Sequence, residues 1–175
     1  MQQTFALTRL HTRKPLHWRS IVADIVLAGL LLGPLAAPFL VSTTLPLLPG
    51  IGGMIYTMGF YVCPQPAYGL MLMPPHIMAV CMRCYGVVIG LLVTRLLYAW
   101  RGADDPWWLP QYGWRGATLM GILIMAYPAE FAGQVFGLWD FHNALVTPFG
   151  LITGLALGLF FVPVLHTQRN IYVKQ

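Results

Sequence analysis

Long apolar runs separated by short polar stretches dominate the chain. A membrane-spanning helix needs about 20 mostly apolar residues, and we expect spans over residues 21–41, 84–100, 117–138 and 146–165. A further apolar run, residues 45–62, carries no charge but contains several prolines and glycines. Its hydropathy alone does not decide whether it crosses.

The distribution of basic residues decides between these two topologies. Cytoplasmic segments of membrane proteins carry an excess of lysine and arginine. If residues 45–62 stay on the outer side and the N-terminus is cytoplasmic, nine of the ten basic residues lie inside and only Arg83 lies outside. If they cross, the ten split evenly. We therefore expect an all-α membrane protein with both termini cytoplasmic, four spans, and a short outer interfacial or re-entrant helix over residues 50–62.

The first span is expected to be retained. Four basic residues precede it, as they do in a secretory signal: Arg9, Arg13, Lys14 and Arg19. However, the apolar run is long for a signal, and a proline follows the small pair Ala36-Ala37 where cleavage would fall. The expected location is a bacterial cytoplasmic membrane.

Composition supports a single integral membrane domain over residues 1–175. Hydrophobic residues make up 58% of the chain and charged residues 9%, and the mean hydropathy is +0.68. A soluble domain carries about a quarter charged residues, so this chain cannot cover its surface with polar groups. The net charge of +5 does not indicate nucleic acid, because the basic residues are not clustered with aromatic residues on one polar face.

Glycines recur every four residues on two of the expected spans. They are Gly86 and Gly90 on the second span, and Gly150, Gly154 and Gly158 on the last. Small residues at this spacing let helix backbones approach closely in lipid. Close helix packing is preferred to a substrate groove along these glycines.

All three cysteines, Cys63, Cys81 and Cys84, fall near the expected outer side. Thiols pair there in bacteria, so a disulfide from Cys63 to either other cysteine is the first expectation. Unpaired structural thiols, a redox pair and a Cys₃His metal site with His76 stay open. Arg83 stands between two of the thiols and opposes a cation. A copper site at the outer methionines is a weaker alternative; these are Met54, Met58, Met71, Met73, Met78 and Met82.

Arg83 needs an acidic partner on the outer side. Glu130 and Asp140 lie at similar depth, and an interhelical ion pair is preferred to a proton or substrate site. Asp24 and Arg95, near the inner interface, are expected to reach water. Haem or pigment ligation is a lesser alternative for four histidines, namely His17, His76, His142 and His166.

Several of these residues carry a family resemblance. Residues 81–86 read Cys-Met-Arg-Cys-Tyr-Gly, Glu130 precedes Gln134 by four positions, and Asn143 follows. The chain resembles a family of uncharacterised bacterial multi-pass membrane proteins, classed only as a domain of unknown function. Its hallmarks are a Cys-His-Gln triplet, a Cys-x-Arg-Cys-x-Gly motif, an acidic residue four positions before a glutamine, and an asparagine followed closely by arginine.

Two hallmarks are altered in this chain. The triplet reads Cys63-Pro64-Gln65, without its histidine, and no arginine follows Asn143 closely. The resemblance covers roughly residues 50–162 and implies a common fold, with no established reaction to carry over. The lost polar groups favour a structural role.

We therefore expect a non-enzymatic subunit of a larger membrane complex of electron-transport or photosynthetic type. Its partners would be lipids and other integral membrane subunits, and it would line a quinone or lipid path. No cofactor is predicted, although contact with lipid, quinone or pigment is open. The alternative is a membrane enzyme or transporter that uses Arg83, Glu130, Gln134 and the cysteines, dependent on a metal or on thiol redox chemistry. No hydrolase triad, zinc-protease motif or phosphate-binding loop supports it.

Overall fold

The computed structural model describes residues 18–101 and 106–166. Four helical segments in this part of the chain are long and apolar enough to cross a membrane. They are α1 (Trp18–Val41), α3 (Met82–Arg101), the consecutive pair α4 (Trp114–Ile124) and α5 (Ala126–Val135), and α6 (Asn143–His166). All four lie within three residues of their expected bounds, and the predicted class of a helical membrane protein with four spans is confirmed.

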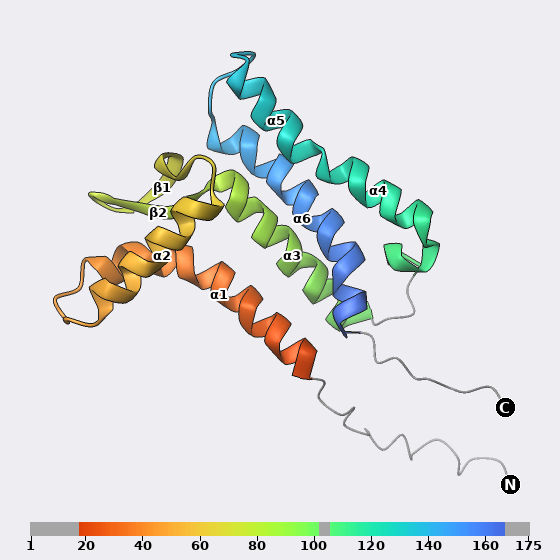
Figure 1. Cartoon of the computed structure of the whole chain (residues 1–175), viewed down its shortest axis with the longest axis horizontal. Helices are drawn as coiled ribbons and strands as arrows, with labels where there is room; N and C mark the ends of the chain where they lie inside the picture. The colour runs from red at the N-terminus through yellow and green to blue at the C-terminus, as the bar shows by residue number, and fades with distance from the viewer. Residues whose placement is uncertain (1–17, 102–105, 167–175) are drawn as a thin grey trace, which may run out of the picture.

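The spans alternate in direction, and the molecule therefore has two distinct ends (Figure 1). At one end α1 and α4 begin and α3 and α6 end; we call this the distal end. At the other end α1 and α5 end and α3 and α6 begin, and we call it the hairpin end because two short strands lie there. His17 and the basic residues before Trp18 and after His166 lie outside the described residues.

The closest helix contact joins α3 to α6 through the predicted glycines. A methyl group at Gly86 would stand 2.6 Å from the carbonyl oxygen of Thr147, and one at Gly90 would stand 2.6 Å from the carbonyl oxygen of Leu151. On α6, side chains at the three glycines would clash with Arg83, Val87 and Thr94 of α3. The structure thus places all five glycines in the α3–α6 contact, four of them against the facing backbone and Gly158 against the Thr94 side chain.

A break at Met125 separates α4 from α5. Pro128 has no backbone N–H, so it cannot bond the carbonyl of Ile124 four residues earlier, and its ring crowds that turn. The bonds on either side persist, from Met125 N–H to Gly121 and from Ala129 N–H to Met125. The third span is therefore one segment with a kink, and its second half runs to the hairpin end (Figure 1).

The short helix α2 (Leu48–Val62) folds back beside the end of α1. Its 15 residues make it shorter than the four spanning segments. After it come the 3₁₀ turn η1 (Pro66–Tyr68), strand β1 (Gly69–Met73) and strand β2 (His76–Cys81), which pairs antiparallel with β1. No strand was expected from the sequence in this region, so the hairpin is an addition to the confirmed helical fold.

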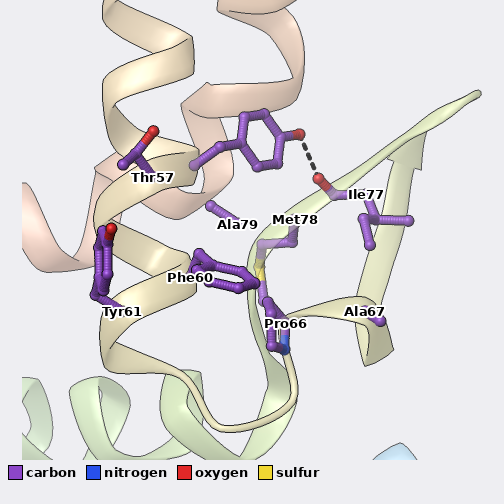
Figure 2. Close-up of a pocket in the computed structure, with 9 residues that line it drawn as sticks. Thr57, Phe60, Tyr61, Pro66, Ala67, Ile77, Met78 and Ala79 are labelled. Carbon is purple, nitrogen blue, oxygen red and sulfur yellow. Dashed lines mark hydrogen bonds between the residues drawn. The ribbon is translucent and has the colours of Figure 1, made fainter.

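The hairpin packs against α2. Tyr56 of α2 donates a hydrogen bond to the carbonyl of Ile77 in β2, and Figure 2 shows this bond beside an aromatic pocket. A side chain at Gly59 would clash with the carbonyl of Ala79, so glycine is needed for this close approach. The pocket has a volume of about 440 Å³, and its walls include Phe60, Tyr61 and Pro66.

Candidate thiol and arginine site

Three segments bring the cysteines together at the hairpin end. Cys63 follows the last turn of α2, and its backbone N–H still bonds the carbonyl of Gly59. Cys81 is the last residue of β2 and leads directly into α3, where Cys84 lies in the first turn. The hairpin reverses the chain between Cys63 and Cys81. Cysteines 18 positions apart in sequence therefore become neighbours.

The three sulfur atoms form one compact cluster. Sγ of Cys63 lies 3.2 Å from Sγ of Cys81, which lies 3.7 Å from Sγ of Cys84. All three atoms are within 4.8 Å of one another. Cys63 and Cys81 are buried and Cys84 is partly buried. The cysteines are free thiols, and the disulfide expected from the sequence stays a prediction.

Arg83 lies in a buried polar network beside this cluster. Its Nε forms an ion pair with Oε2 of Glu130, and both side chains are 0% exposed. Its Nη2 donates to Oε1 of Gln134 at 2.7 Å, and its Nη1 donates to Oε1 of Gln65 at 3.3 Å. Trp139 Nε1 lies 3.4 Å from the other carboxylate oxygen of Glu130. The guanidinium thus links the start of α3 to α5 and to the loop after α2.

Aromatic rings surround the same guanidinium. Its Cζ lies 5.6 Å from the ring centre of Tyr127, 5.2 Å from that of Phe131 and 6.0 Å from that of Phe141. The Tyr127 hydroxyl also lies 3.2 Å from Sγ of Cys84. Tyr127 therefore touches both the arginine network and the thiol cluster, and the two form one continuous site.

Comparison with known proteins identifies the family. The family described as "Predicted membrane protein (DUF2085)" matches residues 63–160, which is more than half of the chain. This chain belongs to that family. The match begins at Cys63, the first cysteine of the site, and it includes all three thiols, Arg83 and Glu130.

A curated relative is similar at lower identity. The uncharacterized protein MJ1492 of Methanocaldococcus jannaschii is 26% identical over 110 residues, which cover 63% of this chain and 67% of that protein. This organism is an archaeon, so the bacterial source expected from the resemblance stays a prediction. No solved structure matches the chain significantly.

Within this DUF2085 chain, the structure separates the residues that the sequence proposed together. Glu130 and Gln134 both reach Arg83, whereas Asp140, in the loop before α6, and Asn143, the first residue of α6, are exposed. His76 starts β2, five residues before Cys81, which corresponds to roughly 16 Å along a strand. It does not join the thiol group found among the described residues.

Gln65 is a site residue whose contact the sequence reasoning missed. In the sequence, Gln65 stands out only as the last member of the altered triplet. In the structure, its side-chain oxygen accepts from Arg83. Its position two residues after Cys63 was the available signal, because anchoring Cys63 beside Cys81 also brings Gln65 to the start of α3.

The thiol contacts perturb the pKa values of the two cysteines that lie outside the spans. The hydrogen bond with the Cys81 thiol, and then that with Cys84, hold the pKa of Cys63 well below its ordinary value. The contact with Cys63 raises the pKa of Cys81. The two pKa values therefore shift in opposite directions within one cluster.

A second polar cluster lies towards the distal end. Arg95 of α3 binds Asp24 of α1 through Nε at 2.6 Å and Nη2 at 2.7 Å. Nε2 of His166, at the end of α6, lies 3.2 Å from the same carboxylate. Asp24 and His166 both fall outside the region that matches the family. This cluster joins three spans and contains no thiol.

Proposed function

We propose that this chain is a non-enzymatic membrane protein that binds a soft metal ion through Cys63, Cys81 and Cys84. The observation that carries the proposal is the convergence of three sulfur atoms within 4.8 Å of one another. A disulfide would use two of these thiols and leave the third without a role. A metal ion uses all three, since deprotonated cysteine is a preferred ligand of zinc and of monovalent copper.

The spacing of the sulfurs suits such an ion. With metal–sulfur bonds of about 2.3 Å, three sulfurs around one ion stand roughly 4 Å apart. Cys81 Sγ lies 3.2 Å from Cys63 Sγ and 3.7 Å from Cys84 Sγ, and the third separation is within 4.8 Å. Small side-chain movements therefore suffice to admit an ion, and the backbone need not move.

The surroundings also favour thiolates. Cys81 immediately precedes α3 and Cys84 lies in its first turn, where unpaired backbone N–H groups and the helix dipole stabilise negative charge. The N–H of Cys81 donates to Sγ of Cys63 at 3.3 Å. The Tyr127 hydroxyl is in place to donate to Sγ of Cys84, as outer groups around metal ligands commonly do.

The arginine network supports a binding role over a catalytic one. Arg83 and Glu130 are buried and bound to each other, so neither side chain is presented to a substrate. The network instead fixes the segment that carries Cys81 and Cys84 against α5.

Thiol protection tests this proposal. The reduced chain, solubilised in detergent, is labelled with a maleimide in the presence and absence of Zn²⁺ or Cu⁺. We expect bound metal to slow the labelling of all three cysteines together, since they share one ion. Equal labelling with and without metal contradicts the proposal, as does a chain isolated from the membrane with a Cys63–Cys81 or Cys63–Cys84 disulfide.

A second candidate, the expected complex subunit, is favoured by the packing of α1. Only 6% of its most apolar stretch is buried, against 39% for α6, and nothing lies within 4 Å of a side chain at Gly29. A small residue on an open helix face suits another membrane helix. Co-purification in mild detergent tests this: a stoichiometric partner supports it, and a stable monomer contradicts it. The electron-transport or photosynthetic setting stays a prediction.

The orientation belongs to the same proposal. Arg19, Arg101 and Arg115 lie at the distal end, and the positive-inside rule then directs that end to the cytoplasm. The thiol site would face the opposite side of the membrane. Reporter fusions at both termini test this, and a reporter active only outside the cytoplasm contradicts it.

A further inference from the structure

We infer that the thiol site holds its ion with three sulfur ligands alone, which makes the ion monovalent copper and not zinc. The inference rests on the proposed metal-binding function and specifies its ligand. Zinc in proteins is almost always four-coordinate, whereas soft monovalent copper is selected by sulfur ligands and is satisfied by three of them. The number of donors available at the cluster therefore distinguishes the two ions.

Within residues 18–101 and 106–166, no fourth cysteine, histidine or carboxylate reaches the sulfurs. Among the described residues, the group of converging metal-ligating atoms contains three cysteines and no histidine, aspartate or glutamate. His76 is held at the far end of β2 by the strand itself. Glu130 is engaged by Arg83 and Trp139. A fourth nitrogen or oxygen ligand would therefore have to come from water or from a phenol.

Water is disfavoured by the shell around the cluster. Cys63 and Cys81 belong to a buried core with Met78, Val80 and Tyr85, and further apolar side chains from α1, the hairpin and α3 pack against it. Cys81 is 0% exposed and Met78 is 1% exposed. A water molecule needs two to four polar partners in such a place. The shell supplies mainly hydrocarbon and thioether sulfur.

The phenol of Tyr127 is the nearest oxygen donor to be considered. Its hydroxyl lies 3.2 Å from Sγ of Cys84, which is hydrogen-bond distance. A neutral phenol is a poor metal ligand but a good donor to a thiolate. Tyr127 therefore acts on the site by orienting Cys84, and it can be tested separately from the sulfur ligands.

X-ray absorption of the loaded full-length chain tests the inference. Reduced protein in detergent receives one equivalent of Cu⁺ or Zn²⁺ without oxygen. We expect the copper spectrum to show three sulfur neighbours and no nitrogen or oxygen. Without a fourth ligand, zinc should be removed by EDTA to less than about a tenth of an equivalent.

Three variants serve as controls. Cys84→Ser should lower the sulfur count from three to two, and Cys84 is only partly buried, so the variant is expected to fold. His76→Ala and Tyr127→Phe should leave the three-sulfur spectrum unchanged. To show that each variant is folded, its helix content and its elution as a single species in size-exclusion chromatography are compared with those of the wild-type chain.

The outcomes separate this inference from the proposed function. If bound zinc resists EDTA and shows a nitrogen or oxygen neighbour, the inference is wrong but the proposed metal binding stands. If that neighbour is then absent in Tyr127→Phe, the extra donor is the Tyr127 phenol. Copper with only two sulfur neighbours also overturns the inference. If neither ion binds the reduced, folded chain in a cysteine-dependent way, both proposals are wrong.

Discussion

The helix α3 carries two arginines that bind carboxylates on other spans, and the two pairs lie in different surroundings. Arg83, in its first turn, binds Glu130 of α5, and both side chains are 0% exposed. Arg95, roughly three turns further on, binds Asp24 of α1 with side-chain exposures of 24% and 41%. The family match contains both residues of the first pair, but it does not reach Asp24 of the second.

The difference in burial gives the pairs different physical roles. Bringing two charges out of water costs several kcal/mol per ion, and removal of one partner leaves the other charge buried and unpaired. Exposed pairs are screened by solvent and contribute little. The Arg83 pair therefore fixes the first turn of α3 and with it Cys81 and Cys84, whereas the Arg95 pair tolerates change. Substitutions in the two pairs should differ accordingly.

The largest effect is expected from Arg83→Met. The variant leaves the Glu130 carboxylate buried without its partner, and we expect a loss of about 3–5 kcal/mol in the free energy of unfolding. Denaturant unfolding of the detergent-solubilised chain measures it. A matched double variant, Arg83→Met with Glu130→Leu, should recover part of the loss because no buried charge is left without a partner. A single variant as stable as the wild-type chain would show that the buried pair does not hold the site.

A smaller effect is expected from Gly154→Leu. A side chain at Gly154 meets the backbone of Val87, so α3 and α6 must separate, at a cost of about 1–3 kcal/mol typical of overpacking. Gly121→Leu is the matched control, because nothing lies within 4 Å of a side chain at that glycine. The same unfolding measurement applies to both. Equal stability of the two variants would contradict the close α3–α6 contact.

The smallest effect is expected from Asp24→Asn. Both side chains of this pair are partly exposed and are expected to reach water near the inner interface, so the loss should stay within about 1 kcal/mol and shrink further at high salt. Unfolding at low and high ionic strength measures it. A loss as large as that in Arg83→Met would erase the distinction between the two pairs.

The sequence predicted the helices well and the hairpin not at all. The spans follow from runs of about 20 apolar residues, which lipid requires, and their glycine spacing indicated how two of them pack. Residues 69–81 are also apolar, and a segment without hydrophobic periodicity cannot be assigned to a strand or a helix from its sequence alone. The pair Pro74-Pro75 was the available turn signal.

The site was predicted as residues but not as an arrangement. Arg83 and Glu130 could be proposed as partners because both are charged and lie at the same depth. The meeting of Cys63 with Cys81 depends on the chain reversal in the hairpin, and the contact between Cys84 and Tyr127 depends on how the kinked α4–α5 segment lies against α3. Neither follows from spacing along the chain. The sequence therefore left a disulfide, free thiols, a redox pair and a metal site open.

The most direct test is the number of metal equivalents bound per chain after reduction, anaerobic loading with Cu⁺ and desalting. One equivalent is predicted for the wild-type chain and for Asp24→Asn. Cys81→Ser should bind far less copper. Arg83→Met should bind less copper than the wild-type chain, because Cys81 and Cys84 are no longer held in place beside Cys63. A reduced, folded wild-type chain that binds no copper, or one that binds the same amount after Cys81→Ser, would contradict a metal site built from these three thiols.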